Sequence, residues 1–482
     1  MAASGTQSAR HVVVVGGGIS GLAAAWQLTG GAAPGPGAPT VTVLESSPRL
    51  GGPLRSDVIG GRVVDLGPDG FLGRRPEALD LCREVGLGDA LVPIAARGAS
   101  VWARGRLRPL PEGHALGIPT RFWPTARSGI VGVRGALGLA RDAVLPRPHG
   151  RGPIGDRAIG PLVSHKLGQR VVDMLADPLI GGIHAGAVDD MSAAATFPPL
   201  LAAAQRRGGL MRGLRAEVPA PDPDGPPLFW ALDGGMACFV DGVATALRRR
   251  GVEIRTSAPV AALARAGGAG GRWRLDVGGE SGGDTVDADA VVLATSAPVT
   301  ASLLRPHDDE VAGLLDAIDY ASVVLVTFRV NHDDVAGLGD GTGFLVPRRS
   351  PHKGREPWAV TACTYLDHKW PHVGRDGETL LRASLGRVDD RRAQEWSDDE
   401  VASRAWEELG ALMGADGTPL ETRVTRFVDA FPQYRVHHLL RTAGVEAALG
   451  RLGGVAVAGA AYRGVGIPAC IASGRAAASA LL

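Results

Sequence analysis

A glycine-rich turn between an apolar run and an alanine-rich stretch constrains this chain more than any other feature. Residues 12–26, VVVVGGGISGLAAAW, place four valines before Gly16, Gly18 and Gly21 and a helix-forming stretch after them. The pattern predicts a strand, a tight turn and a helix from about Gly21 to Thr29, followed by a second strand in TVTVLE, residues 40–45. Because the crossover is right-handed, the two strands are predicted to be parallel in a βαβ unit.

The spacing within this unit is that of a dinucleotide-binding turn. The three glycines would allow a tight turn, close backbone approach to a pyrophosphate and close packing of helix on strand, with N–H groups at the helix start facing the anion. Glu45 follows Gly21 by 24 residues, where a carboxylate can accept the ribose hydroxyls of an adenosine. An acid here disfavours NADP. A purely structural turn with a solvent-facing glutamate is the alternative.

Length and composition indicate a globular protein with a large core. At 482 residues the chain exceeds one ordinary core and predicts two or three domains, and its 45% hydrophobic and 21% charged residues argue against disorder. The formal net charge of +1 provides no basic field for a phosphate backbone, so nucleic-acid binding is not expected.

Neither cysteine pairing nor membrane insertion is indicated. Cys82, Cys238, Cys363 and Cys470 form no CxxC pair, which argues against a disulfide framework or a thiolate metal site and favours a reducing cytoplasm. Residues 12–44 lack Asp, Glu, Lys and Arg, but glycines and prolines interrupt them, so no transmembrane segment is predicted. The N-terminus MAASGTQSAR predicts no secretory signal.

Further along the chain, helical and strand patterns alternate in blocks. Stretches rich in Pro, Gly and Arg at about 141–160 and 205–227 predict linkers or mobile loops, and RVVDMLADPLIGGIHAG between them predicts a helical insertion. Strand patterns follow from Gly251, and those after residue 320 predict an antiparallel sheet. A helix is predicted at about 398–413, and the closing strand, loop and helix are predicted to fold back onto the first unit.

Two segments far apart in the sequence favour FAD over NAD. SPRLGG, residues 47–52, and AGAAYRGVGIPACIASGRAA near the C-terminus resemble the two ends of the flavin site in the amine-oxidase-like flavoproteins. A single βαβ unit needs no partner at the far terminus, whereas a cofactor as long as FAD does. This resemblance implies that Arg49, Gly51 and Gly52 line the pyrophosphate and ribityl chain.

The chain more narrowly resembles the oxygen-dependent porphyrinogen oxidases of haem biosynthesis. The similarity runs from about Arg10 to Ala478 and is carried by HVVVVGGGISGLAAAW, GPDGFLGRRPEAL, PLIGGIHAG, ATFPPL, GTGFLVPR, TACTYLDHKWPH, TLLRASLGR, RFVDAFPQYRVHH and GVGIPACI. TACTYLDHKWPH and FPQYRVHH are similar to the soluble bacterial branch that oxidises coproporphyrinogen III. The membrane-attached branch oxidises protoporphyrinogen IX.

The resemblance implies an α/β fold in several parts. We expect a Rossmann-type FAD-binding domain, an antiparallel-sheet substrate domain and a helical insertion. The expected segments are 1–90, 211–300 and 426–482 for the FAD-binding domain, 91–210 for the helical insertion and substrate- or membrane-facing domain, and 301–425 for the substrate-binding sheet.

The same resemblance implies the site residues. FAD is expected to contact Gly16, Gly17, Gly18, Ile19, Ser20, Gly21, Glu45, Ser46, Arg49, Gly51, Gly52, Gly67, Pro68, Asp69, Gly70, Val260, Phe427, Val465, Gly466, Ile467 and Pro468. Arg75 matches a basic position facing a substrate propionate, and Ile183 lies on a segment that lines the pocket. Arg74 and Arg75 as solvated charges are the alternative.

Three residues depart from the family pattern. Pro53 stands where a lysine is frequent, Phe427 where tryptophan is frequent, and Ala469 where aspartate is frequent. These departures leave the flavin in place but put its binding strength in question.

No acid, base or metal is assigned to catalysis, because a flavin would take the hydride and O₂ would regenerate it. His437 and His438 lack further ligands at metal spacing and are predicted to be a surface or loop pair. Cys470 is predicted to be a small buried cysteine rather than a point of covalent flavin attachment.

Other functions and partners stay open at this point. The sequence leaves protoporphyrinogen IX as an alternative substrate, and a flavin amine oxidase or a non-catalytic flavin- or porphyrin-binding protein as alternative functions. A cage for amines would require aromatic residues, which make up only 5% of the chain. The resemblance implies a cytoplasmic protein. Peripheral contact with the inner face of the membrane and handover of the product to a ferrochelatase are two further options. It leaves the oligomeric state open.

Overall fold

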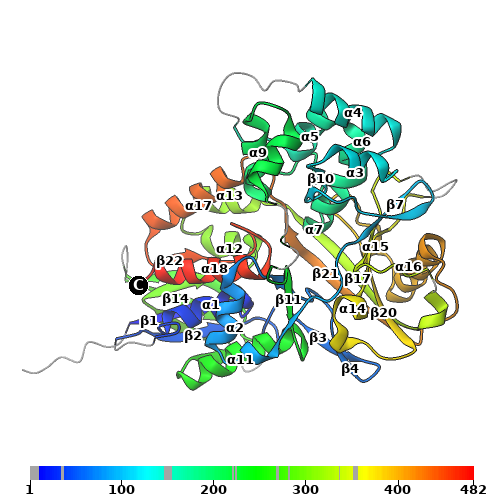
Figure 1. Cartoon of the computed structure of the whole chain (residues 1–482). Helices are drawn as coiled ribbons and strands as arrows, with labels where there is room; N and C mark the ends of the chain where they lie inside the picture. The colour runs from blue at the N-terminus through cyan, green and yellow to red at the C-terminus, as the bar shows by residue number, and fades with distance from the viewer. Residues whose placement is uncertain are drawn as a thin grey trace, which may run out of the picture.

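A computed structural model describes residues 10–33, 37–145, 155–219, 222, 225–267, 271–279, 283–335, 337–350 and 356–482. Figure 1 shows three regions: a sheet covered by helices that holds both the first and last elements, a group of helices above it, and a large second sheet beside it. The predicted linker residues 146–154, 220, 221, 223 and 224 lie outside the described residues.

The first region is built on a parallel five-stranded sheet with the order β12-β2-β1-β16-β22. Each strand pairs in parallel with its neighbours. The strands are β1 (His11–Val15), β2 (Thr40–Leu44), β12 (Glu253–Arg255), β16 (Ala290–Leu293) and β22 (Val455–Val457). The predicted βαβ start and the return of the C-terminus to it are both present.

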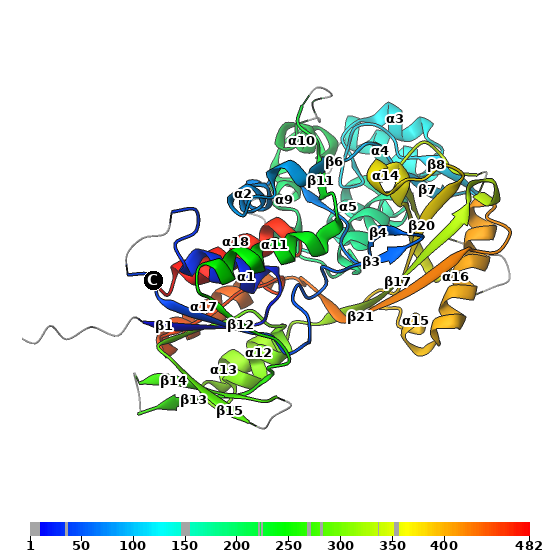
Figure 2. The ribbon, with the colours of Figure 1, turned by 90° about the horizontal axis from the view of Figure 1, so that it is seen from below.

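Alternate residues of these strands enter two separate hydrophobic clusters, one on each face of the sheet. Val12 and Val14 pack with the helices of one face, and Val13 and Val15 pack with those of the other. The first face carries α1 (Ile19–Leu28), α11 (Gly235–Arg249) and α18 (Ile467–Ser479). The second carries α12 (Ala297–Leu304), α13 (Asp309–Asp316) and α17 (His438–Leu452), with the small sheet β13 (Val260–Ala266), β14 (Arg272–Val277) and β15 (Asp284–Ala288) beside them (Figure 2).

The helical region forms its own hydrophobic cluster from residues 101–214. Its helices are α3 (Phe122–Arg127), α4 (Gly132–Val144), α5 (Ile159–Leu167), α6 (Gln169–Val171), α7 (Gly182–His184), α8 (Ala193–Thr196), α9 (Pro198–Gln205) and α10 (Leu210–Glu217), beside the hairpin β9 (His114–Ala115) and β10 (Ile118–Pro119). Within the predicted helical insertion, η2 (Val172–Gly181) is a π-helix that contains Pro178. Apolar spacing indicates helix here but does not distinguish a π-helix from an α-helix.

The large sheet has seven strands in the order β21-β17-β20-β19-β18-β7-β8. Its strands are β7 (Ser100–Ala103), β8 (Arg106–Pro109), β17 (Tyr320–Asn331), β18 (Gly343–Leu345), β19 (Val360–Tyr365), β20 (Glu378–Leu385) and β21 (Glu421–Pro432). One face packs on α15 (Arg392–Glu395) and α16 (Asp398–Met413). All its ladders are antiparallel except that of β7 with β18.

Shorter elements join the three regions. They include β3 (Ser56–Ile59), β4 (Arg62–Asp65), β5 (Phe71–Leu72), β6 (Leu91–Pro93), β11 (Phe229–Leu232), α2 (Pro76–Glu84) and α14 (Leu366–Lys369), with the 3₁₀ turns η1 (Gly88–Ala90), η3 (His332–Val335) and η4 (Pro371–Val373). Within the described ranges, none of the helices combines the length and hydropathy that a membrane crossing requires.

A buried carboxylate anchors the start of α11. Asp65 Oδ1 accepts a hydrogen bond from the Met236 N–H at 2.7 Å and another from the Ser56 hydroxyl at 2.6 Å. Gly235 adopts a φ of +79°, and a side chain there would meet Ser56 Oγ at 2.5 Å. Burial raises the pKa of Asp65 to about 6, although both hydrogen bonds favour the charged form.

We predict that Asp65→Asn stabilises the fold more at pH 8 than at pH 4.5. Because the folded pKa of about 6 lies above the ordinary value of 3.8, the stability from protonated Asp65 is complete below pH 3.8 and is lost as pH rises through 6. The asparagine oxygen can accept both hydrogen bonds without a charge. In urea unfolding, the free energy of unfolding gained by the substitution should be larger at pH 8 than at pH 4.5 by on the order of 2 kcal/mol. Asp399→Asn, on the exposed face of α16, is the control, and an equal gain at both pH values would contradict the prediction.

Candidate active site

The predicted cofactor residues gather at the carboxyl ends of the parallel strands. Gly16–Gly18 follow β1 and Glu45 follows β2, next to the point where the chain order in the sheet reverses between β2, β1 and β16. A Cβ on Gly18 would meet no atom within 4 Å, whereas one on Gly21 would lie 1.9 Å from the Gly16 carbonyl oxygen. Gly21 therefore allows α1 to pack on β1, while Gly18 faces open space.

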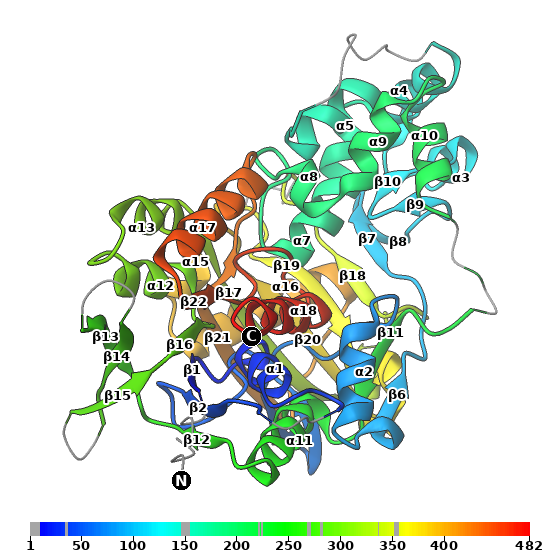
Figure 3. The same ribbon diagram turned by 90° about the vertical axis from the view of Figure 1, so that its left-hand side faces the viewer.

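Two helix N-termini lie beside this open space. Neither α1, after Gly18, nor α18, after Gly466, has a side-chain cap on its first N–H groups. The helices touch closely, because a Cβ on Gly474 of α18 would lie 2.0 Å from the Ser20 carbonyl oxygen of α1 (Figure 3). The uncapped N–H groups and the positive dipole end of each helix N-terminus favour an anion such as the pyrophosphate of a dinucleotide. This chemistry fits the predicted FAD.

Glu45 connects the glycine turn to the next strand. Its carboxylate accepts hydrogen bonds from the Gly17 N–H at 2.7 Å and the Ser47 N–H at 2.8 Å, and the Ser46 hydroxyl lies 3.4 Å away. Its carbonyl accepts from the Ala258 N–H at 2.9 Å, two residues before Val260 at the start of β13. Glu45 is half-buried, so its carboxylate both orders the turn and stays accessible to a ribose.

The 49–52 loop closes over the same turn. The Gly51 N–H donates to the Gly17 carbonyl at 2.9 Å, and Gly51 and Gly52 have φ values of +98° and +56° that favour glycine. The exposed guanidinium of Arg49 donates to the carbonyls of Leu50, Gly52 and Leu54. A cation held by neutral carbonyls keeps its full charge beside the two helix N-termini.

The 67–70 segment is fixed to the large sheet through Asp69. The buried Asp69 carboxylate accepts from Lys369 Nζ at 3.0 Å, from the Trp370 indole N–H at 3.0 Å and from Arg382 at 3.2 Å. Burial alone raises the pKa of Asp69, but Lys369 and Arg382 outweigh it and hold the pKa well below its ordinary range. The carboxylate is thus occupied by protein groups, and only the backbone around Gly67, Pro68 and Gly70 is available to a cofactor.

Phe427 lies against this segment from strand β21. A Cβ on Gly67 would lie 3.1 Å from the tip of the Phe427 ring, and the guanidinium of Arg55 stacks over that ring at 4.7 Å. The contact places the predicted flavin segment 67–70 against the face of the large sheet opposite α16.

That face carries four aligned side chains that are partly exposed, although they lie in central strands. The register pairs Leu345 with Ala362, Ala362 with Ser384, and Ser384 with Leu325 across β18, β19, β20 and β17. Their neighbours on the other face, such as Phe344, Cys363 and Ala383, are buried under α16. We call Leu325, Leu345, Ala362 and Ser384 the central row. It is uncharged and, at about 4.8 Å per strand, about 14 Å long.

The two predicted substrate residues lie on different elements near this region. Ile183 belongs to α7, and its side chain is 52% exposed; a Cβ on its neighbour Gly182 would lie 3.8 Å from Leu345 of the central row. Arg75 precedes α2, is half-exposed and pairs with Glu77 at 2.7 Å. Its charge acts on the thiol of Cys470 in the first turn of α18, although burial dominates and raises the Cys470 pKa to about 11.

The prediction that His437 and His438 form a surface or loop pair is wrong for His438. His438 is fully buried as the first residue of α17, stacked on Tyr434 with ring centroids 4.0 Å apart. Two polar residues in a row gave no sign that one would turn inward. Within the described part of the chain, no three His, Cys, Asp or Glu residues gather as metal ligands would.

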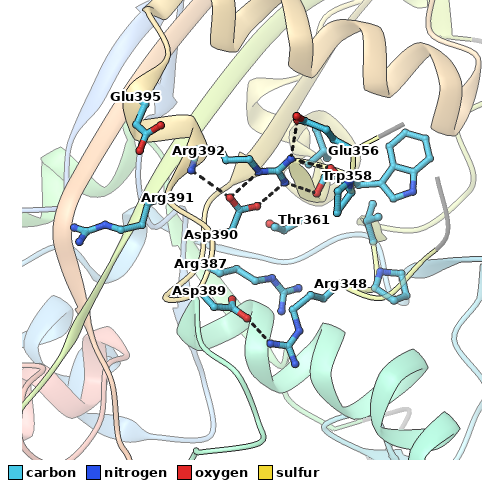
Figure 4. A pocket seen from close by; sticks show the side chains of 14 residues that line it. Arg348, Glu356, Trp358, Thr361, Arg387, Asp389, Asp390, Arg391, Arg392 and Glu395 are labelled. Atoms are coloured by element: carbon cyan, nitrogen blue, oxygen red, sulfur yellow. Dashed lines mark hydrogen bonds and ion pairs between the residues drawn. The ribbon is translucent and has the colours of Figure 1, made fainter. Parts of the chain in front are cut away.

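A cavity of about 590 Å³ lies elsewhere, where the interior strands β18, β19 and β20 of the large sheet end. Figure 4 shows Trp358, Arg392 and Asp390 at one side of it and Arg348, Arg387 and Asp389 at the other. Its four arginines already pair with carboxylates: Arg348 with Asp177, Asp189 and Asp389, Arg387 with Asp177, Arg391 with Asp429, and Arg392 with Asp390 and Glu356. The predicted site residues, all of which the structure describes, do not line it. Its charges hold η2 to the sheet.

Comparison with known proteins identifies the family. The model of the family described as flavin containing amine oxidoreductase matches residues 19–482. The chain belongs to this family. It is therefore a flavin-dependent oxidoreductase, and the predicted α/β fold is confirmed.

Several relatives within this family match along nearly the whole chain. The coproporphyrinogen III oxidase of Bacillus subtilis (strain 168) is 32% identical over 98% of this chain and 97% of its own length. The enzyme of the same name from Propionibacterium freudenreichii is 34% identical over 96% and 89%. The protoporphyrinogen oxidase of Macaca fascicularis is 30% identical over 98% of both chains.

Solved structures share the fold. A crystal structure from Exiguobacterium sp. 255-15 aligns with a TM-score of 0.86 and 31% identity, covering 98% of this chain and 99% of that one. Cyclohexylamine oxidase from Brevibacterium oxydans aligns with a TM-score of 0.64 and 17% identity over 98% of both chains, a likeness of fold alone.

Sequence reasoning missed several residues that shape the flavoprotein's site. Lys369, Trp370 and Arg382 fix the 67–70 segment, and the central row depends on strand register, which a single sequence does not reveal. The strings TACTYLDHKWPH and TLLRASLGR contain five of these seven residues, all but Leu325 and Leu345, but gave no sign of which face each would occupy.

We predict that Asp69→Ala destabilises the protein strongly. The change leaves the buried Arg382 and the partly buried Lys369 without their shared carboxylate, which costs about 3–5 kcal/mol. Urea unfolding measures the loss. Glu400→Gln, which removes an exposed pair with Arg404, is the control and should cost less than about 1 kcal/mol. Equal losses of unfolding free energy for the two changes would show that the contacts of Asp69 with Lys369 and Arg382 do not hold the regions together.

We also predict that Gly18→Val removes the flavin but keeps the fold. The new side chain would point into open space, so the variant should unfold as the flavin-free wild-type protein does, while it loses the flavin absorbance. Gly283→Val is the matched control, because a Cβ there also meets no atom within 4 Å but lies far along the chain, before β15. Flavin retained at the wild-type level in Gly18→Val would place the cofactor elsewhere.

Proposed function

We propose that this chain is an FAD-dependent oxidase that converts coproporphyrinogen III to coproporphyrin III in haem biosynthesis. The reaction removes six electrons in three cycles, and each cycle takes a hydride and a proton from the substrate and reduces one O₂ to hydrogen peroxide. The observation that carries the proposal is the central row. It is a partly exposed, uncharged stretch about 14 Å long, suited to a broad macrocyclic substrate, in a chain with full-length relatives named for this activity.

The proposed cofactor is FAD rather than a shorter flavin. Gly16–Gly18, Ile19, Ser20 and the first turn of α18 would hold the pyrophosphate, and Glu45 with Val260 the adenosine. The segment 465–468, Gly67 and Phe427 would surround the isoalloxazine ring. When bound, FAD supplies the hydride acceptor that O₂ reoxidises.

The protein's own residues would orient the substrate and keep water away. The central row would hold one face of the macrocycle by apolar contact, and Ile183 of α7 would close the side next to Leu345. Arg75 would hold a propionate, since its guanidinium is half-exposed and more accessible than its carboxylate partner Glu77. Ser384 is the polar member of the row and would face the substrate's polar edge.

Two other activities compete with this proposal. A flavin amine oxidase would need an aromatic cage, but the central row has no aromatic member, and the amine oxidases share the fold alone. Protoporphyrinogen IX as substrate is favoured by the relative from Macaca fascicularis. A flavin- or porphyrin-binding protein without turnover is the third alternative.

The proposal extends to location and partners. The four cysteines are free in the structure, as a protein of the reducing cytoplasm requires. Handover of coproporphyrin to a ferrochelatase and contact with the inner face of the membrane remain predictions from the family resemblance, as does the division of the chain at residues 90, 210, 300 and 425.

The test supplies coproporphyrinogen III and protoporphyrinogen IX side by side to the flavin-loaded protein in air and follows porphyrin fluorescence. We expect a clearly higher kcat/KM for coproporphyrinogen III, with three hydrogen peroxide molecules per porphyrin. A flavin-free sample controls for spontaneous oxidation. The reverse preference would make the enzyme a protoporphyrinogen oxidase, and no rate above the control with either substrate would refute the oxidase proposal.

We predict that Ser384→Phe lowers kcat/KM for coproporphyrinogen III more than for protoporphyrinogen IX, by at least ten-fold. A ring in the central row would occupy space and remove a polar neighbour that the two additional propionates need, whereas vinyl groups tolerate an apolar neighbour. Thr422→Phe, at an exposed position of β21, is the control. An equal loss of kcat/KM with both substrates would show that Ser384 does not contribute to the choice between them.

A further inference from the structure

Tyr434 pins the loop between β22 and α18 through its hydroxyl group. The hydroxyl accepts a hydrogen bond from the Gly464 N–H at 2.7 Å and donates one to the Ala460 carbonyl. Tyr434 is buried, with 3% of its surface exposed, and it follows the end of β21. One side chain thus bridges two points, four residues apart, on the loop that leads into α18.

His438 makes a third contact with the same loop. Its Nε2 lies 3.0 Å from the Tyr462 carbonyl oxygen, and because a carbonyl only accepts, Nε2 carries the proton and donates. Its Nδ1 is buried without a partner. Burial lowers the pKa of His438 to about 4, so the ring stays neutral in this tautomer at neutral pH. The stacked rings of Tyr434 and His438 therefore hold Ala460, Tyr462 and Gly464 together.

Tyr434 also meets the helical region. Its carbonyl accepts from the Ser192 N–H at 2.7 Å, and its ring lies 6.2 Å from that of His184, the residue after Ile183. The amide of the adjacent Gln433 donates to the His184 carbonyl at 3.0 Å. Tyr434 therefore lies where the end of strand β21, the end of α7 and the loop before α18 come together.

The bridged loop leads directly to the expected flavin contacts. Gly464 precedes Val465 and Gly466, and the uncapped N-terminus of α18 begins at the next residue. Gly464 has a φ of +140°, and a Cβ there would lie 2.7 Å from that of Ala469, so the chain turns tightly at this point. A loop with this turn needs external hydrogen bonds to hold its peptide groups in one orientation.

We propose that Tyr434 and His438 are positioning residues for the flavin: their side chains hold the 459–466 loop in the conformation that receives the isoalloxazine end of the cofactor. The inference rests on the proposed function only in that FAD is the group bound. Both residues act through the loop and neither contacts the reacting atoms. Because Tyr434 also meets α7, the same side chain ties the flavin loop to the segment beside the substrate.

The experiment compares Tyr434→Phe with Tyr365→Phe in the full chain. Tyr365 is equally buried, but its ring packs on Phe344 and His368 within the large sheet. Flavin is removed, and each apoprotein is titrated with FAD while the visible absorption spectrum is recorded. We expect Tyr434→Phe to raise the Kd for FAD about ten-fold and to change the shape of the bound-flavin bands, and Tyr365→Phe to leave both as in the wild type.

His438 supplies the second comparison. His438→Gln keeps an N–H that can reach the Tyr462 carbonyl and should retain most of the FAD affinity, whereas His438→Leu should lose it as Tyr434→Phe does. Thermal unfolding of the apoproteins separates a positioning role from loss of fold, since Tyr434→Phe should still unfold cooperatively, with its Tm lowered only by the loss of its two hydrogen bonds.

Wild-type affinity and spectrum in Tyr434→Phe would overturn the inference and leave the proposed function standing. A wild-type protein that binds no FAD would refute the proposed cofactor instead. In turnover, Tyr434→Phe should lower kcat at saturating FAD with little change in KM for the porphyrinogen. A raised KM with unchanged kcat would assign Tyr434 to the substrate side and contradict the proposal.

Discussion

Two backbone contacts bring the cofactor end of this protein together. Gly21 lets α1 lie against the carbonyl of Gly16, and Gly474 lets α18 lie against the carbonyl of Ser20, at distances that leave no room for a side chain. Helix α18 comes from the end of the chain and α1 from its beginning, so the contact also closes the fold. As a result two uncapped helix N-termini face the same space, and an anion there is stabilised by both.

Buried charges connect this end to the rest of the molecule. Asp69 joins the first region to the large sheet through Lys369 and Arg382, and Asp177 of η2 joins the helical region to the same sheet through the buried Arg387. Pairs of this kind contribute little net stability relative to apolar packing, but breaking one partner is costly. They therefore fix how the regions sit against each other, which determines the spacing between the flavin segments and the central row.

The sequence was sufficient for features that depend on local chemistry. The first βαβ unit, the return of the C-terminal strand and helix, and the helix at 398–413 all followed from periodicity and glycine placement, and α16 spans the predicted residues. Features that depend on distant pairing did not follow. The π-helix η2, the joining of β7–β8 to the large sheet, the burial of His438 and the central row are set by tertiary packing and strand register.

The parallel ladder between β7 and β18 has a consequence for how substrate is exchanged. Strand β7 leads into the helical region, and β18 lies in the large sheet, so backbone hydrogen bonds hold the near end of that region while the Asp177–Arg387 pair holds η2. If the helical region moved away as a rigid body, the hydrogen bonds between β7 and β18 would have to break and the buried Asp177–Arg387 pair would become exposed. Exchange of a bulky substrate would then depend on the motion of side chains, such as that of the exposed Ile183 of α7, and not on movement of the helical region.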